Sequence, residues 1–245
     1  MDYSKLDEGY AQTSLGKLHY RQHEGGGQKI LFLHGYGATI KAWSRLVAQL
    51  PDGLSVYLLD LLGHGDSDAP HIKYTLDVQL QTVGEFIEKK GLEDGYLFGN
   101  SYGGWIAAAI AQGNFKGRGI ILEDAGGLLE YFEDANEKEG ADAYAKRMTK
   151  EAVMLNAHEH VAKSIMHSRD VNEMLTRESL SSIVKPTLVI WGEDDKVVDV
   201  KYGRLFSEYI KGSALEVIKG AGHVPHFTHA GRVSELLLEF VGYQQ

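Results

Sequence analysis

The sequence predicts an α/β fold, built on a doubly wound, mostly parallel sheet with helices on both faces. Short, continuous apolar runs at residues 29–33, 55–60 and 119–125 are typical of strands that are buried on both faces. Helical patterns separate these runs, and at residues 76–90 apolar side chains recur at three- and four-residue spacing. Strands that alternate with helices imply right-handed βαβ units, which combine into one parallel sheet.

Other segments complete this sheet. Residues 10–24 alternate in places between apolar and polar side chains, which predicts one or two antiparallel strands. The remaining strands are expected at residues 96–98, 187–191 and 214–218, and the remaining helices at 41–50, 104–111, 200–210 and 231–241.

The texture of the chain changes between residues 128 and 184. No β-rich run occurs there, and charged residues, Ala and Met dominate, so the segment predicts several short helices. Because strands lie on both sides of it, the segment is expected to form a small helical cap inserted after the sixth strand. The expected division is a core of residues 1–127 and 185–245 and a cap of residues 128–184.

The composition excludes several classes of function. The net charge is −9 and no Lys/Arg-rich run occurs, which argues against a nucleic-acid partner. The chain has no cysteine, so disulfides, thiolate metal sites and a cysteine nucleophile are excluded. The N-terminus lacks the apolar core of a signal peptide, and no apolar run reaches the ~18 residues of a membrane span. We expect a soluble, cytoplasmic protein, and leave a homodimer open.

Residues 99–103 (GNSYG) form the most informative motif. They follow the apolar run 96–98 and precede a stretch rich in helix formers, so Ser101 lies between two glycines at a strand-to-helix junction. This arrangement has the form of a nucleophile elbow, a tight turn that lifts the serine hydroxyl clear of the sheet. An ordinary Gly-rich loop also fits the five residues, so the interpretation depends on the rest of the chain.

Other polar residues follow the predicted strands and should meet Ser101 at one edge of the sheet. These are His34, Asp60, Asp124, Asp195 and His223. A serine hydroxyl needs a base to take its proton, and the base needs an acid to fix its tautomer. The candidate base is His223 and the candidate acid is Asp195. The other possible acids are Glu193, Asp194, Asp199 and Asp124.

With these residues in place, the sequence resembles the α/β-hydrolase superfamily over nearly its whole length, in particular the branch of capped serine esterases, C–C hydrolases and haloperoxidase-like proteins. Residues 34–37 (HGYG) resemble the HGxG loop, and Asp60 with residues 63–67 (GHGDS) resembles the D-x-x-G-x-G-x-S segment. Ser101 matches GxSxG, Asp195 matches W-G-x-x-D and His223 matches G-H-x-P. The chain order Ser, Asp, His is also that of these hydrolases.

The resemblance implies roles for particular residues. The backbone N–H groups of Tyr36 and Tyr102 would form the oxyanion hole, and Ser101 would form an acyl-enzyme that a water activated by His223 hydrolyses. A serine nucleophile argues against epoxide hydrolase and haloalkane dehalogenase activities, which use aspartate.

Two departures from the family pattern concern positions near these residues. Asn100 stands where many relatives have His. Relatives often continue Pro-His-x-Glu-x-Pro after the base, and here Thr228 occupies the position of that Glu, which leaves the anchoring of the loop open.

We expect a substrate pocket where the chain leaves the sheet for the cap. Its candidate lining residues are Gly35, Trp105, Leu128, Leu129 and Val224, with Tyr131 and Phe132 beside them. For Met148, Met154, Leu155, Met166, Met174 and Leu175, helical spacing favours packing over ligand contact for most.

Several histidines and an aspartate have other expected roles. His34, His64 and Asp60 should anchor loops, and His158 and His160 should be solvated. His223, His226 and His229 could suggest a metal site, but without Cys or an H-E-x-x-H helix we expect no metal and no cofactor.

The sequence therefore favours a carboxylesterase acting on small to medium acyl esters. The alternatives are a C–C bond or thioester hydrolase using the same triad, and a non-enzymatic ligand-binding receptor that retains it. A strongly polar or cationic cap surface facing Ser101 would favour a carboxylate-bearing substrate over a neutral ester.

Overall fold

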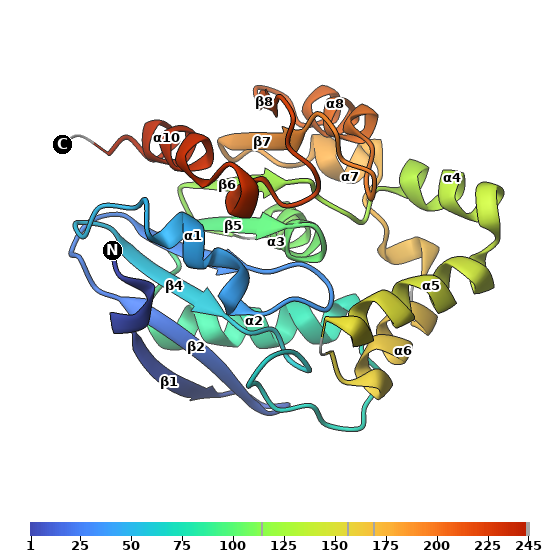
Figure 1. Cartoon of the computed structure of the whole chain (residues 1–245), viewed down its shortest axis with the longest axis horizontal. Coiled ribbons are helices and arrows are strands. Elements are labelled where there is room, and N and C mark those ends of the chain that lie inside the picture. The colour runs from blue at the N-terminus through green and yellow to red at the C-terminus, as the bar shows by residue number, and fades with distance from the viewer. Residues whose placement is uncertain (114, 156, 169, 244–245) are drawn as a thin grey trace.

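The computed structural model of the protein describes residues 1–113, 115–155, 157–168 and 170–243, and it contains one eight-stranded sheet (Figure 1). The strand order is β1-β2-β4-β3-β5-β6-β7-β8. The strands are β1 (Asp7–Gln12), β2 (Lys17–His23), β3 (Lys29–Leu33), β4 (Ser55–Leu59), β5 (Tyr96–Asn100), β6 (Gly119–Glu123), β7 (Thr187–Gly192) and β8 (Ala214–Ile218). Strands β3 to β8 pair in parallel, whereas β1 and β2 are antiparallel to their neighbours. The predicted doubly wound, mostly parallel α/β fold is confirmed.

Helices cover both faces of this sheet, as the alternation along β3 illustrates. Leu31 and Leu33 belong to a buried cluster that contains side chains of α2 (Leu76–Lys90), α3 (Tyr102–Gln112) and α8 (Val200–Tyr209). Ile30 and Phe32 belong to a second cluster, with side chains of α1 (Ser44–Val47) and α10 (Ala230–Phe240). Successive residues of a strand point to opposite faces, so one apolar run supplies both layers of the core.

The expected helix at 41–50 is interrupted. The structure has a 3-10 helix, η2 (Ile40–Trp43), followed by the single turn α1. The N–H groups of Gln49 and Leu50 donate to the carbonyls three residues earlier, at 2.8 and 3.0 Å, and Pro51 follows. The turn tightens because proline disfavours a helical conformation in the residue before it and cannot donate a hydrogen bond itself.

The segment between β6 and β7 is helical, as predicted. It contains α4 (Leu129–Glu139), α5 (Ala141–Met154), α6 (Glu159–His167), the 3-10 helix η3 (Val171–Glu173) and α7 (Arg177–Ser181). Figure 1 shows α4, α5 and α6 beyond the arrowheads of the parallel strands. The two ends of the segment are joined, because Leu129 N–H donates to the Leu175 carbonyl at 2.9 Å and Leu175 N–H donates to that of Gly127 at 2.7 Å. These helices therefore lie over the carboxyl ends of the strands.

A short helix, α9 (Pro225–Thr228), precedes α10, and a 3-10 turn, η1 (Tyr3–Lys5), opens the chain. Among the described residues, no helix combines the length and the apolar character that a membrane crossing requires.

The close approach of β5, α3 and β3 makes Gly103 irreplaceable. A Cβ at Gly103 would lie 2.0 Å from the Leu33 carbonyl oxygen, whereas a Cβ at Gly84, within α2, would meet nothing within 4 Å. We expect Gly103→Ala to lower the free energy of unfolding by about 3 kcal/mol or more, because backbone must move. Gly84→Ala should raise it by about 0.5–1 kcal/mol, because Gly is a poor residue in a helix interior. Urea denaturation measures both, and equal effects would contradict this account of the junction.

Candidate active site

Ser101 occupies a strained turn between β5 and α3. Its φ of 51° and ψ of −111° lie outside the usual regions for a residue with a side chain. Hydrogen bonds from the neighbouring strand end hold it there: Ser101 N–H donates to the Glu123 carbonyl at 2.9 Å, and Gly126 N–H donates to the Ser101 carbonyl at 2.9 Å. Such strain persists only where the surrounding structure imposes it, and it is concentrated at functional sites.

The structure brings Ser101, His223 and Asp195 into one hydrogen-bonded array. His223 Nε2 lies 2.9 Å from Ser101 Oγ, and His223 Nδ1 lies 2.7 Å from Asp195 Oδ2. The other oxygen of Asp195 accepts the N–H groups of Val197 and Val198, at 2.7 and 3.0 Å. The Asp195 side chain is buried and that of His223 is 18% exposed. With the proton on Nδ1, His223 can accept the serine proton at Nε2, as general-base chemistry requires.

Of the other candidate acids beside Asp195, Asp194 is exposed, and Asp199 and Glu193 hold backbone N–H groups elsewhere. Asp199 accepts Lys201 N–H at 2.8 Å and caps α8, and Glu193 accepts Gly220 N–H at 3.3 Å.

Asp124, which follows β6, is fully buried with φ 44°. Its Oδ1 accepts Gly192 N–H at 2.8 Å, and its carboxyl group lies beside that of Asp195. Burial, and then the negative charges of Glu123 and Asp195, raise the pKa of Asp124 well above its usual range. Ionisation of Asp124 is therefore disfavoured, and Asp195 is the acid that faces His223.

The candidate oxyanion donors come from two chain segments beside Ser101. Tyr102 is the first residue of α3, where backbone N–H groups have no acceptor within the helix. Tyr36 follows Gly35, where an added Cβ would lie 3.3 Å from Ser101 Cβ. The loop after β3 therefore lies directly against the serine. Burial raises the pKa of the Tyr102 phenol, so this side chain stays neutral beside the site.

A cavity of about 70 Å³ lies against Ser101, and we call it the inner chamber. Its lining residues are Tyr36, Ser101, Tyr102, Trp105, Gly126, Gly127, Leu128, Tyr131, Phe132, Tyr144, Met148, Met166, Met174, Val197 and Val198. None of these side chains carries a charge. The chamber is therefore an apolar space that ends at the Ser101 hydroxyl.

The residues expected to line a substrate pocket differ in where they lie relative to the inner chamber. Trp105 and Leu128 line the inner chamber, and Gly35, Leu129 and Val224 do not. Gly35 faces Asn100 and Ser101, Leu129 begins α4 and packs on the core, and Val224 is 37% exposed on the surface.

Of the six apolar residues of the insert that were expected mostly to pack, Met166, Met174 and Leu175 belong to the buried core and Met148 packs against it. Met148, Met166 and Met174 all line the chamber, and Met154 and Leu155 are exposed. The sequence pattern identified these residues as apolar, but it did not show which of them face the chamber. Val197 and Val198, beside the acid, carried no signal in the sequence.

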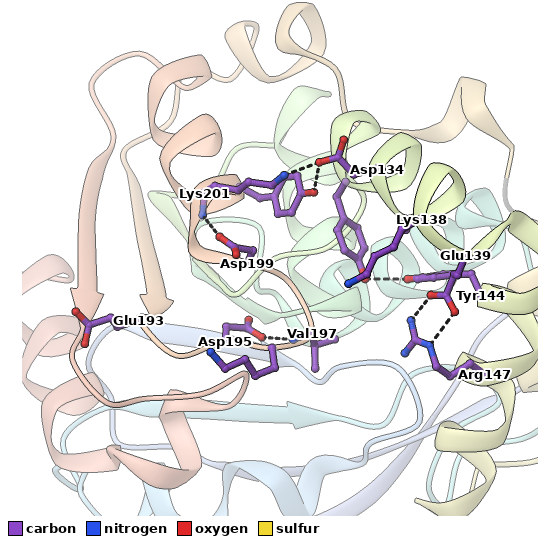
Figure 2. Close-up of a pocket in the computed structure, with 14 residues that line it drawn as sticks. Asp134, Lys138, Glu139, Tyr144, Arg147, Glu193, Asp195, Val197, Asp199 and Lys201 are labelled. Atoms are coloured by element: carbon purple, nitrogen blue, oxygen red, sulfur yellow. Dashed lines mark hydrogen bonds and ion pairs between the residues drawn. The ribbon is translucent and has the colours of Figure 1, made fainter.

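A larger cavity of about 780 Å³ adjoins the inner chamber, with Tyr131, Tyr144 and Val197 lining both. We call it the vestibule. Figure 2 shows residues of α4 and α5 on one side of it and residues between β7 and α8 on the other. Its lining residues form ion pairs with one another. Lys201 Nζ lies 2.5 Å from Asp134 Oδ2, and Arg147 Nη2 lies 2.6 Å from Glu139 Oε1. The site thus has an apolar interior and a charged entrance.

The expected loop anchors are confirmed. Asp60 accepts Ile40 N–H at 2.8 Å and Asp66 N–H at 3.2 Å, and it lies 2.7 Å from His19 Nδ1. His34 connects the Gly35 carbonyl, at 2.8 Å, with Leu61 N–H, at 3.1 Å.

His64 Nδ1 lies 3.3 Å from the Leu62 carbonyl, and burial lowers the pKa of His64 to about 3. His160 is not simply solvated, because its ring stacks on His71 at 4.2 Å and its Nε2 lies 3.1 Å from the Ala69 carbonyl.

Two groups of described residues place potential metal-ligand atoms within 4.8 Å of one another: His19, Asp60 and Asp66, and Asp124, Asp195 and His223. In each group the histidine ring is already hydrogen-bonded to a carboxylate, His19 to Asp60 and His223 to Asp195. Neither group offers a set of uncommitted ligand atoms.

Comparison with known proteins agrees with this geometry. The model of a family described as alpha/beta hydrolases matches residues 30–236, so the chain belongs to the alpha/beta hydrolase family, and membership indicates an enzyme. A 2-hydroxy-6-oxononadienedioate/2-hydroxy-6-oxononatrienedioate hydrolase of Pseudomonas putida is 27% identical, over 92% of this chain and 91% of that protein. Monoacylglycerol lipase abhd6-A of Xenopus laevis is 24% identical, over 96% and 80%. The structure of a thermophilic esterase from Thermogutta terrifontis has the same fold, with a TM-score of 0.78 at 21% identity over 96% of this chain and 98% of that one.

The raised pKa of Asp124 should make the stability of the protein depend on pH. The unfolded chain releases the Asp124 proton near the usual carboxyl pKa, whereas the folded protein retains it to higher pH. The contribution of Asp124 to the stability of wild type therefore falls as pH rises above about 4. Asp124→Asn, which stays neutral and keeps an oxygen for Gly192 N–H, should be more stable than wild type at pH 7.5, with a smaller advantage at pH 4.

Urea denaturation at the two pH values measures this difference. Asp94→Asn is the control, because Asp94 is 66% exposed. An advantage of Asp124→Asn that does not change with pH would show that Asp124 is ionised in the folded protein.

Proposed function

We propose that this protein is a serine carboxylesterase that cleaves small to medium acyl esters. Ser101 attacks the ester carbonyl while His223 takes its proton, and Asp195 holds the imidazole in the tautomer that permits this transfer. His223 then returns the proton to the leaving alcohol, and an acyl-enzyme remains on Ser101. A water that gives its proton to His223 hydrolyses this intermediate.

The backbone N–H groups of Tyr36 and Tyr102 receive the oxyanion in this mechanism. Each such donor commonly contributes about 3–4 kcal/mol to transition-state stabilisation. This mechanism requires no metal and no cofactor. The serine is the nucleophile, the histidine is the base, and the two N–H groups stabilise the oxyanion.

The uncharged lining of the inner chamber is the main observation in favour of an ester as the substrate. A carboxylate held in this apolar space would lose its hydration without gaining a charged partner. The described residues around the chamber offer aromatic rings, methionines and valines, which suit a neutral acyl group. We therefore place the acyl chain in the inner chamber and the alcohol in the vestibule, with residues 128–184 acting as a cap on the core of residues 1–127 and 185–245.

A C–C bond hydrolase is the second candidate, because relatives support it. Besides the Pseudomonas putida protein, a 2-hydroxy-6-oxo-6-(2'-aminophenyl)hexa-2,4-dienoic acid hydrolase of Metapseudomonas resinovorans is 24% identical over 97% of this chain. The names of these substrates specify carboxylates. A member of this substrate class cleaved faster than any neutral ester would replace the esterase proposal.

The first test is hydrolysis of a p-nitrophenyl ester series from acetate to laurate. Wild type should turn over many times, and Ser101→Ala should lower kcat about 10⁴- to 10⁶-fold because the nucleophile is gone. Release of nitrophenol is followed by absorbance. A wild type that turns over none of these esters, or a Ser101→Ala variant that keeps activity, would refute the proposal. One equivalent of nitrophenol without turnover would favour the receptor alternative.

The second test concerns the acyl group. Met148→Ala removes a long side chain from the chamber wall, so the preferred acyl chain should lengthen and kcat/KM for the longer esters should rise relative to acetate. Met154→Ala is the matched control, because Met154 lies on the same helix and is 65% exposed. The same preference in both variants would place the acyl chain elsewhere.

A further inference from the structure

A buried carboxylate, Glu123, lies next to the Ser101–His223 pair and has no part in the mechanism proposed above. It is the last residue of β6, and its side chain is fully buried. Glu123 Oε1 accepts His226 N–H at 2.8 Å, and Oε2 accepts Asn100 Nδ2–H at 3.1 Å and contacts His226 Nδ1. A buried carboxylate is costly unless its hydrogen bonds are satisfied, so its partners indicate what it holds.

Those partners belong to the two segments that carry Ser101 and His223. Asn100 directly precedes Ser101, and His226 follows His223 by three residues. Asn100 Nδ2 also lies 3.2 Å from the His223 carbonyl oxygen, and the Glu123 carbonyl accepts Ser101 N–H. The backbone of Glu123 therefore holds the serine turn, while its side chain holds the histidine loop.

The histidine loop, residues 219–228, is fixed on both sides of His223. Before it, Ala221 is fully buried and its carbonyl accepts Asp194 N–H at 2.8 Å. After it, His226 is buried and its ring packs on Trp43 with centroids 4.1 Å apart. The family pattern would place a glutamate at Thr228, within the loop itself, and here β6 supplies the carboxylate.

We propose that Glu123 is a positioning residue for His223: its carboxylate, acting through His226 and Asn100, keeps the imidazole within hydrogen-bond distance of Ser101 Oγ. This inference rests on the Ser101–His223 pair of the proposed function. It extends that function by naming the residue whose hydrogen bonds set the distance between Ser101 and His223. A displacement of about 1 Å between reacting groups can lower a rate about 100-fold.

The test is the rate at which diisopropyl fluorophosphate labels Ser101, measured by intact mass. In this reaction the Ser101 Oγ–P bond forms, the P–F bond breaks, fluoride leaves and His223 takes the hydroxyl proton. In Glu123→Gln the amide keeps the shape but replaces one acceptor oxygen with an N–H₂ group that faces donors. We expect the labelling rate constant to fall about 10- to 100-fold, with kcat on esters falling in parallel and KM within about twofold.

The end point of labelling separates positioning from folding. If Glu123 only stabilised the fold, Glu123→Gln would lower the labelled fraction and leave the rate constant of the folded molecules unchanged. Glu85→Gln is the control, because Glu85 also accepts hydrogen bonds, from Ser14, but lies on α2. It should be labelled at the wild-type rate.

Asn100→Ala is the second variant, and it decides the question if Glu123→Gln does not fold. It removes the bridge to the His223 carbonyl and leaves the Glu123–His226 pair intact, so it should also slow labelling. A wild-type rate constant in folded Glu123→Gln, or in Asn100→Ala where the former does not fold, would overturn the proposal.

A wild type that is labelled but hydrolyses no ester would refute only the esterase function, and one that is not labelled would refute both.

Discussion

Ser101 has a backbone conformation that residues with side chains avoid, and main-chain hydrogen bonds to the end of β6 hold it there. The turn is possible because Gly103 lets α3 pack against the Leu33 carbonyl, leaving no room for a side chain. The same turn begins α3, so the serine hydroxyl and the first N–H groups of the helix reach the same point in space. The hydroxyl therefore has its place before any ligand binds.

The strand that holds this turn also concentrates negative charge. Glu123 ends β6, Asp124 follows it, and Asp195 follows β7, the next strand of the sheet. Three carboxyl groups this close do not all ionise together, and each has a different environment. Asp195 accepts two backbone N–H groups and faces His223, Glu123 is paired with His226, and burial raises the pKa of Asp124. Each of the three acids therefore has its own partners and its own role.

The sequence predicted the strands and the residues of the array because each lies at the end of an apolar run or within a motif whose spacing reflects its chemistry. Glu123 escaped prediction, since it resembles any polar residue that ends a strand, and His226 is 103 positions away. Nothing in local spacing connects two such residues. The insert shows the same limit, because the spacing that identified Met148, Met166 and Met174 as apolar could not show which side faces Ser101.

The division between strand ends and insert has a physical consequence for specificity. The reacting groups are attached to a sheet whose strands are buried on both faces, and such a framework resists movement. The far wall of the chamber comes from α4, α5 and α6, with methionine and aromatic side chains, and methionine adapts to irregular shapes. Changes in this wall would alter which ligand fits the chamber while the distances between Ser101, His223 and Asp195 stay fixed. In the function proposed above, the array therefore defines the reaction, and the insert, with its apolar chamber and charged vestibule, defines the substrate.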